Sequence, residues 1–326
     1  MPSTPPRVTV GLPVYNGEAF LQAAVDSLLA QDFEDFELLI ADNGSTDATE
    51  EIARRAVSAD ARVRYERSED NRGAAWNFNR CVGLARGELF KWAAADDLAA
   101  PSFLSACLAA LDADPGLVLA FPGTIDIDEE DRPLCRYRPA RIAVQQRPSD
   151  RFADCLAHLR HCYSVFGVMR REALRQTRLI GPFTGSDKAL LVELALRGRF
   201  LEVPVEAFLH RQHDRRSMVV YSHAVARMEW FDTSRAKRIG LPYVRLGAEY
   251  ARAIGNAPLP LSERAACASH LLAWTMAHRR QLAGDLLSAG VQAGRRWWAR
   301  KPARPAGPTG EPTYDHVPIP LEPPSS

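Results

Sequence analysis

Short apolar runs and helix-spaced apolar positions alternate along the first 120 residues. Apolar runs predict strands at 8–12, 36–41, 89–93 and 117–121, and 63–66 is predicted as a further strand. Apolar side chains that recur three or four residues apart predict helices at 21–31, 48–57 and 74–85. A further helix is predicted from Pro101, whose fixed φ suits a first helical turn. Strands separated by helices favour right-handed crossovers and a mostly parallel sheet, so we predict an α/β fold.

Beyond residue 121 the pattern changes twice. Residues 122–146 are irregular, and short helix-like and strand-like pieces then alternate to about residue 211. Residues 224–298 are helical in pattern, with breaks at 240–242 and 257–260. Residues 302–326 hold eight of the chain's 23 prolines, which predicts a disordered tail. We therefore expect an α/β domain over 1–222, a helical region over 223–300 and the tail over 301–326.

Composition narrows the class of protein. Of the 326 residues, 46% are apolar and 25% are charged, which is ordinary for a globular chain. The 41 Lys and Arg against 40 Asp and Glu give a net charge of +1, which argues against a nucleic-acid partner. The longest stretches without a charged side chain, 98–111 and 265–278, are fourteen residues each. A membrane-spanning helix needs about 20, so no membrane span is expected.

The N-terminus and the cysteines indicate a compartment. A single early cation, Arg7, precedes the first apolar run, and no small-residue cleavage site follows, so we expect no signal peptide. Six cysteines are scattered through the chain, which is typical of reduced thiols rather than of a disulfide framework. We therefore expect a cytoplasmic protein.

Candidate chemistry follows three of the predicted strands. In an open parallel sheet, ligands bind beyond the carboxyl ends of the strands. The loops there are Pro13–Gly17, Asp42–Asp47 and Ala94–Asp97. They carry an aromatic ring (Tyr15), a leading carboxylate (Asp42) and a carboxylate pair (Asp96 and Asp97). Such groups can stack on a base, accept hydrogen bonds from a base or a ribose, and hold Mg²⁺ or Mn²⁺ together with substrate phosphates.

Each of these loops also has a purely structural interpretation. Residues 42–47 could form an Asx turn and a helix cap, Asp96 and Asp97 could cap the next helix, and Tyr15 could be a buried aromatic. The convergence of all three loops on one sheet edge favours a site, because adjacent carboxylates repel unless a cation compensates them. No Gly-x-Gly-x-x-Gly follows the first strand and no Gly-Lys-Ser/Thr P-loop is present, so metal would have to neutralise a bound diphosphate.

The ordered motifs Leu12–Gly17, Ala41–Asp47, Asn71–Gly73 and Ala95–Asp97 resemble those of family 2 glycosyltransferases over roughly residues 7–120. The resemblance implies the GT-A fold of nucleotide-diphospho-sugar transferases. It implies that Pro13, Tyr15 and Asp42 line the pocket for the base, that Asp96 lies near the ribose, and that Asp97 coordinates Mn²⁺ or Mg²⁺ on the diphosphate. It also places Asn16, Asn71 and Gly73 among the residues that bind the nucleotide-sugar.

The family's catalytic base usually follows as Glu-Asp at the start of a helix. Here Gly185-Ser-Asp-Lys188 precedes an apolar helical stretch, so the resemblance assigns the base to Asp187. Ser186 departs from the family's glutamate. The structural alternative is a carboxylate that simply favours a helix N-terminus.

Two further positions bear on the donor site. The segment Leu209–His213, with Ser217, resembles the family's segment that folds over the donor, and implies that His213 completes the metal shell or touches the diphosphate. The alternative is a histidine satisfied by its own fold. Trp76 stands where the family often has an arginine, so a cation near the nucleotide is either absent or supplied by Arg72.

Two residue groups have weaker interpretations. Cys155, His158, His161 and Cys162 are zinc-type ligands within eight residues, but one straight helix rarely surrounds a tetrahedral ion, so core packing is favoured. The segment Arg295–Lys301 is basic and aromatic, which suits either a peripheral contact with an anionic membrane or a helix end packed on its own domain.

Together these features predict an inverting, metal-dependent glycosyltransferase. It would move a sugar from a UDP-, dTDP- or GDP-linked donor to an acceptor hydroxyl, as in the glycosylation of a polysaccharide, glycolipid or secondary metabolite. A nucleotidyltransferase on a similar sheet is an alternative, but residues 13–17 lack the Gly-rich basic loop that it needs. A non-catalytic sugar-nucleotide-binding module is another, and the presence of both Asp97 and Asp187 argues against it. The sequence does not specify the oligomeric state.

Overall fold

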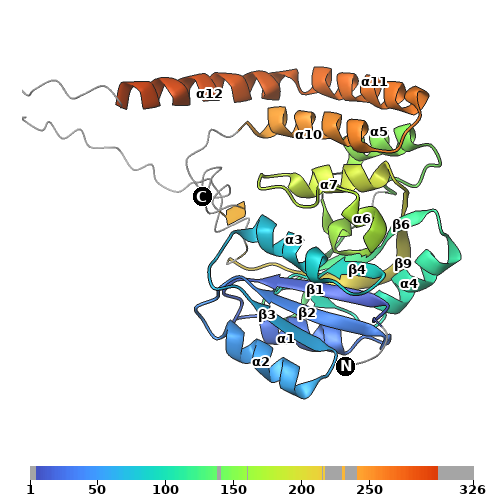
Figure 1. Cartoon of the computed structure of the whole chain (residues 1–326), viewed down its shortest axis with the longest axis vertical. Coiled ribbons are helices and arrows are strands. Elements are labelled where there is room, and N and C mark those ends of the chain that lie inside the picture. The colour runs from blue at the N-terminus through green and yellow to red at the C-terminus, as the bar shows by residue number, and fades with distance from the viewer. Residues whose placement is uncertain are drawn as a thin grey trace, which may run out of the picture.

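The computed structural model describes residues 5–137, 141–159, 161–214, 216, 230–231 and 241–299, with the backbone alone over 290–299. Its centre is a nine-stranded mixed sheet in the order β3-β2-β1-β4-β8-β6-β9-β5, with β7 paired to β6 (Figure 1). Helices pack on both faces of this sheet. The predicted α/β class with a mostly parallel sheet is confirmed.

The N-terminal half follows the predicted alternation closely. Parallel pairing joins β1 to β2 and β4, and β2 to β3. These strands are β1 (Val8–Val14), β2 (Phe36–Asp42), β3 (Val63–Arg67) and β4 (Leu89–Trp92). The intervening helices are α1 (Leu21–Leu29), α2 (Thr49–Ala59) and α3 (Ala74–Leu84). The next helix, α4 (Phe103–Ala113), begins two residues after Pro101, so the prediction that Pro101 opens it is wrong: Pro101 lies in the preceding turn.

The second half of the sheet departs from the predicted pattern. A strand was expected to end at residue 121, yet β6 (Leu117–Ile127) continues, and its pairing register with β9 (Arg199–Arg211) shifts around Pro122 and Gly123. These two residues mimic a turn in the sequence but are accommodated as strand irregularities. β8 (Val168–Arg170) runs antiparallel between β4 and β6. β5 (Leu98–Ala99) and β7 (Pro133–Arg136) are also antiparallel additions, to β9 and β6.

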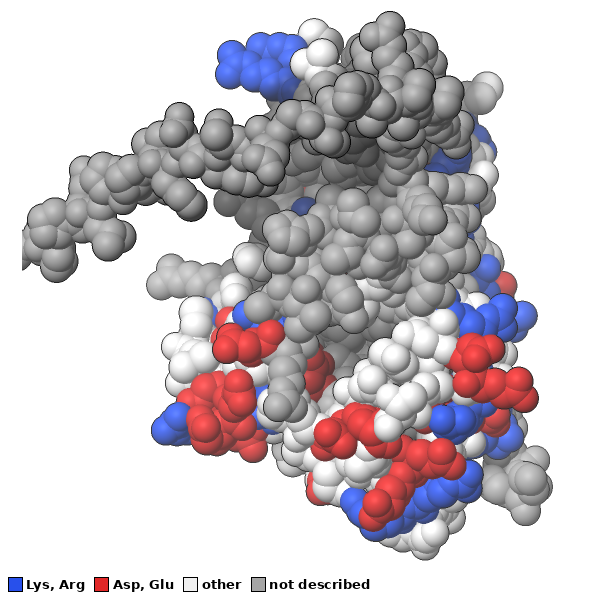
Figure 2. All heavy atoms as spheres, turned by 90° about the vertical axis from the view of Figure 1, so that its left-hand side faces the viewer, with Lys and Arg blue, Asp and Glu red and all other residues white. Residues whose placement is uncertain are grey.

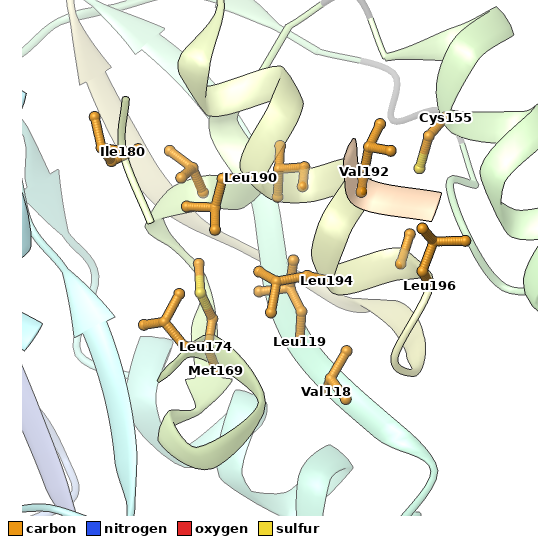
Figure 3. Close-up of a cluster of buried hydrophobic side chains, with 14 of the residues drawn as sticks. Val118, Leu119, Cys155, Met169, Leu174, Ile180, Leu190, Val192, Leu194 and Leu196 are labelled. Atoms are coloured by element: carbon orange, nitrogen blue, oxygen red, sulfur yellow. The ribbon is translucent and has the colours of Figure 1, made fainter. Parts of the chain in front are cut away.

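Two apolar clusters fill the space on either side of the sheet. One joins Val10 and Leu12 of β1 to α1 and α4. The other joins Phe90 and Trp92 of β4, and Leu119 of β6, to α3, α5 (Pro148–His158) and α7 (Ser186–Ala195). Figure 3 shows Leu190 and Leu194 of α7 gathered with Leu119, Met169 and Leu174, the last from α6 (Arg171–Arg175). α7 is therefore apolar on nearly all sides and fixes the position of its own N-terminus.

The C-terminal helices extend the second cluster. α10 (Pro242–Asn256) packs on α7, and α11 (Leu261–Ala277) packs on α5 (Figure 1). Tyr250 and Trp274 are buried in the same cluster as the sheet residues. α12 (Arg279–Ala299) supplies Asp285, whose carboxylate accepts the backbone N–H groups of Tyr243 and Val244 at the start of α10. The predicted helix break between 257 and 260 is confirmed; of the break predicted at 240–242, residue 240 lies outside the described residues and α10 begins at Pro242.

The described surface agrees with the near-zero net charge. Figure 2 shows acidic and basic side chains interspersed on the lower part of one face, at the height of α1 and α2. All six cysteines are unpaired, as expected. None of the helices in the described ranges combines the length and the apolar character needed to cross a membrane. The boundary at 222/223 and the tail at 301–326 lie outside the described residues, so the three-part division stays a prediction.

The shared core leads to a stability prediction. Trp274 is 8% exposed and packs edge-on against Tyr250, with ring centroids 5.4 Å apart. Trp274→Ala should therefore lower the free energy of unfolding by about 3–5 kcal/mol. Urea unfolding should show this loss in the single main transition. Leu272→Ala, on the exposed side of the same helix at 64% exposure, should change it by less than about 0.5 kcal/mol. A separate early transition that carried the whole loss would show that the helices form an independent unit.

Candidate active site

The loop after β1 is held by the loop after β2. Asn16 has a positive φ of 52°, and its backbone N–H donates to Ser45 Oγ at 2.9 Å. The Thr46 N–H donates back to Asn16 Oδ1 at 2.9 Å. The next residue of the first loop, Gly17, donates its N–H to Thr49 Oγ1 at the start of α2, at 2.8 Å. The side chain of Asn16 therefore joins the two loops, and its role in binding the nucleotide-sugar stays a prediction.

Asp42 ends β2 with no exposed surface. Its Oδ1 accepts the Ser45 N–H at 2.8 Å, which is the local turn expected from the sequence. Its Oδ2 accepts the Tyr65 hydroxyl at 2.6 Å and lies 3.4 Å from Arg67 Nε. Burial, and then the Asp42 carboxylate, raise the pKa of Tyr65, so this phenol remains protonated. The buried Asp42 side chain thus fixes the conformation of the loop that follows β2.

Asn43, between Asp42 and Gly44, links the β2 loop to the Asn71–Gly73 motif. Its Nδ2 donates to Asn71 Oδ1 at 2.9 Å and to the Gly73 carbonyl at 3.2 Å, and its Oδ1 accepts the Arg72 N–H at 3.1 Å. Asn71 Oδ1 also accepts the Gly73 N–H at 2.9 Å. Gly73 adopts a φ of 87°, a conformation that favours glycine. The predicted residues Asn71 and Gly73 are therefore brought to the same edge as Asp42.

Two aromatic positions flank this edge. Tyr15 is 44% exposed, so the alternative of a buried ring is wrong. Pro13, by contrast, is buried within β1 opposite Ala41. Trp76 carries the Arg72 guanidinium 4.2 Å above its ring, so a cation does lie at the position where the family's arginine is replaced.

The carboxylate pair lies beyond β4 and is held by the end of β9. Asp97 is 7% exposed, and its Oδ1 accepts the Arg211 backbone N–H at 2.9 Å. Asp96 is more open, and its Oδ2 lies 3.0 Å from His213 Nε2. The Arg211 side chain donates to the Asp96 carbonyl at 2.9 Å. The structure therefore brings together the three residues that were predicted separately for ribose and metal binding.

Burial and the neighbouring charge both disfavour the ionised form of Asp97. Burial, and then the Asp96 carboxylate, raise the pKa of Asp97 well above its usual value. Lys91 of β4 is 2% exposed, donates to the Trp92 carbonyl at 2.9 Å and lies 4.2 Å from the centre of the Phe103 ring. Burial lowers the pKa of Lys91 to about 8. A cation bound at the pair would favour the charged form of Asp97.

The side-chain atoms of Asp96, Asp97 and His213 are of the types that bind a divalent cation. Carboxylate oxygens suit Mg²⁺ and Mn²⁺, and an octahedral ion with bonds of about 2.1 Å holds neighbouring ligands about 3 Å apart. Asp96 Oδ2 and His213 Nε2 are hydrogen-bonded at 3.0 Å, a separation that adjacent ligands of such an ion could also have. His213 Nδ1 is buried without a hydrogen-bond partner in the described part of the chain. No group of three metal-binding side chains occurs among the described residues, so such an ion would need oxygen atoms from a substrate as well.

Asp187 lies in the first turn of α7, half-buried, after Gly185 with a φ of 89°. Its Oδ1 accepts the Lys188 backbone N–H at 2.8 Å, which is compatible with the helix-end alternative. Burial, and then the Asp187 carboxylate, raise the pKa of the Cys162 thiol, which places Asp187 beside Cys162. Burial also raises the pKa of Tyr163, with smaller contributions from Tyr137, Asp126 and Asp97. Asp187 and Asp97 thus both belong to the electrostatic surroundings of residues 162 and 163.

The cysteine–histidine group does not form a metal site in the described residues. Helix α5 ends at His158, so the four side chains do not share one helix. Cys155 is in the core, and His158 is exposed beside Asp154, with His158 Nδ1 2.8 Å from Asp154 Oδ1. The predicted core packing is confirmed for Cys155.

Sequence reasoning missed Arg211 and Phe20. The Arg211 guanidinium is 1% exposed and lies 4.8 Å from the centre of the Phe20 ring, which packs against His213 at 4.6 Å between centroids. Arg211 lies within the segment Leu209–His213 that led to the prediction of His213, so its place in that segment was the available signal. Phe20 carried no comparable signal, because a single aromatic before a helix is common.

Solved structures show which class of protein has this fold. S. aureus TarS (residues 1–349) in complex with UDP-GlcNAc superimposes with a TM-score of 0.62 at 17% identity, over 86% of this chain and 79% of that one. The mannosyltransferase PcManGT from Pyrobaculum calidifontis, in complex with GDP-Man and Mn²⁺, has a TM-score of 0.50 at 20% identity, over 91% and 81%. At these identities the likeness shows the fold alone, which is the GT-A fold of glycosyltransferases.

The sequence profile of the family described as Glycosyl transferase family 2 matches residues 9–178, just over half of the chain. The chain therefore belongs to glycosyl transferase family 2, and the predicted resemblance and enzyme class are confirmed. The uncharacterized glycosyltransferase RT0329 of Rickettsia typhi is 32% identical over 135 residues. That segment is 41% of this chain and 41% of the relative, so the chain spans less than half of the relative's length.

Proposed function

We propose that this glycosyltransferase moves a sugar from a nucleotide-diphosphate donor to an acceptor hydroxyl, with a divalent cation and with inversion at the anomeric carbon. The arrangement of Asp96, Asp97 and His213 at the sheet edge carries the proposal, because a dianionic diphosphate needs a cation there. The complexes of TarS with UDP-GlcNAc and of PcManGT with GDP-Man and Mn²⁺ support this donor class and this type of ion.

The nucleotide would lie along the three joined loops. Tyr15, exposed at the end of β1, offers a ring face to the base, and Asp42 maintains the loop beneath it. The opposite side of the nucleotide would be bounded by Asn71, Gly73 and Arg72, whose guanidinium stacks on the Trp76 ring. Asp96 would contact the ribose or share the ion with His213, and Asp97 would hold the ion on the diphosphate. UDP-, dTDP- and GDP-linked sugars are all candidates.

The chain's residues then perform two tasks. Asp187 accepts the proton of the acceptor hydroxyl while that oxygen bonds to the anomeric carbon and the bond to the diphosphate oxygen breaks on the opposite face. Asp96, Asp97 and His213 would hold the cation, which when bound would supply Lewis-acid stabilisation of the departing diphosphate. Arg211 keeps Asp97 and the Asp96 backbone in place during the reaction.

The proposal also covers the cellular compartment of the enzyme and the roles of its two regions. Six unpaired cysteines support a reducing compartment such as the cytoplasm. The basic and aromatic sequence 295–301 at the end of α12 supports a peripheral contact with an anionic membrane. We assign catalysis to residues 1–222 and a supporting role to the helices of 223–300.

A thermal-shift panel tests the donor and the metal together. UDP-, dTDP- and GDP-sugars should be added with Mn²⁺ and, separately, with EDTA. At about 100 times its dissociation constant, the correct donor should stabilise the protein by about 2.7 kcal/mol with Mn²⁺ and by much less with EDTA. Equal stabilisation under both conditions would contradict the metal-dependent site.

The role of Asp187 has a matched control. Asp187→Asn should lower sugar transfer to water or to an acceptor at least 100-fold, roughly what a lost general base removes, with donor affinity nearly unchanged. Asp150→Asn alters an exposed aspartate in the first turn of α5 and should leave transfer unchanged. Metal-dependent donor turnover measures both variants. Similar activity in Asp187→Asn and wild type would assign Asp187 to the helix end alone.

A further inference from the structure

Four rings gather beside the proposed site, and we call them the ring cluster: Tyr137, His161, Tyr163 and His210. Tyr163, the first residue of η1 (Tyr163–Phe166), lies at its centre. Its ring centroid is 5.0 Å from that of Tyr137, 4.8 Å from that of His210 and 5.6 Å from that of His161. The His161 and Tyr163 planes are only 10° apart, so the two rings are stacked. His161 is exposed, and the other three rings are partly exposed.

A buried carboxylate fixes the orientation of two of these rings. Asp126 of β6 is 7% exposed and faces His210 across the β6–β9 pairing. Its Oδ1 lies 2.9 Å from His210 Nδ1, and its Oδ2 accepts the Tyr137 hydroxyl at 3.0 Å. The Gln212 amide also lies 2.9 Å from His210 Nδ1. Because a carboxylate only accepts, the contact with Asp126 requires a proton on Nδ1, and the Gln212 amide must then turn its oxygen toward that proton.

The ring cluster lies next to the proposed donor site. His210 directly precedes Arg211, whose backbone N–H donates to Asp97 Oδ1 at 2.9 Å, and Leu209 pairs with Leu98, the residue after Asp97. On the other side of the cluster, Cys162, the neighbour of Tyr163, is beside Asp187. The cluster is therefore adjacent both to the proposed diphosphate end of the donor and to the proposed base. None of its members takes part in the donor site described above.

The chemistry of the ring cluster selects among acceptor classes. Aromatic faces are electron-rich, so they attract the weakly positive C–H face of a sugar ring, while polar edge groups bind its hydroxyls. A lipid tail would gain little from the polar edge, which would have to be desolvated. An anionic acceptor such as a polyol phosphate would be repelled by the Asp126 carboxylate.

We propose that the ring cluster binds the acceptor and that the acceptor is a carbohydrate, whose pyranose ring lies against His161 and Tyr163 with its hydroxyls toward His210 and Tyr137. The acceptor role rests on the proposed function, whereas carbohydrate binding by these rings does not. Asp126 is a positioning residue here, since it acts through His210 and Tyr137.

Saturation-transfer NMR on the full chain without donor tests carbohydrate binding directly. The probes are methyl β-D-glucopyranoside, methyl α-D-mannopyranoside and, as an anionic polyol, glycerol 3-phosphate. His161→Ala removes the exposed ring with little risk to the fold. His158→Ala removes another exposed histidine three residues earlier and serves as the matched control. UDP- and GDP-sugar affinity with Mn²⁺ is measured on the same proteins.

We expect at least one methyl glycoside to give C–H saturation transfer with the wild type, and glycerol 3-phosphate to give none. The glycoside's dissociation constant should rise at least about threefold in His161→Ala, the effect of one aromatic contact, and not in His158→Ala. No signal from either glycoside, or equal binding by all three proteins, would overturn the proposal. If a glycoside bound but no nucleotide-sugar did, carbohydrate binding by the ring cluster would be supported and the proposed function would be refuted.

Discussion

The site depends on one buried cation, the Arg211 guanidinium at the end of β9. Taking a guanidinium out of water is costly unless all of its donors find acceptors. Arg211 meets this requirement with the carbonyls of Asp96, Asp128 and Glu129 and with the Asp131 carboxylate, 2.5 Å from its Nη2. Its own N–H meanwhile fixes Asp97. The guanidinium therefore joins the loop after β4 to the β6–β7 turn and holds the carboxylate pair in place.

The same strand organises both halves of the proposed reaction. His213 follows Arg211 and faces Asp96, on the donor side, while His210 precedes it and faces Asp126, on the acceptor side. Successive side chains of a strand alternate between faces, so one strand end can serve two neighbouring regions. α7 completes the arrangement from the other cluster, because its buried apolar residues position Asp187 beside Cys162.

How much of this could be predicted varies along the chain. The parallel half was predictable because strands such as β1 are largely apolar and are followed by amphipathic helices such as α1. β3, which reads VRYER, was located by its place between two predicted helices. Pro122 and Gly123 concealed the second half of β6, and strands as short as β5 and β8 have no readable periodicity. Asp96, Asp97 and His213 were found through local motifs. The Asp126–His210 pair was not, because it exists only through the pairing of β6 with β9.

The central claim is that a divalent ion binds a diphosphate at the carboxylate pair that Arg211 holds. Anomalous diffraction near the manganese absorption edge, from crystals grown with Mn²⁺ and a nucleoside diphosphate, tests it most directly. The account predicts a manganese peak within about 2.3 Å of an Asp97 carboxylate oxygen, with phosphate oxygens completing its shell. A bound diphosphate whose manganese lies away from both Asp96 and Asp97 would contradict it.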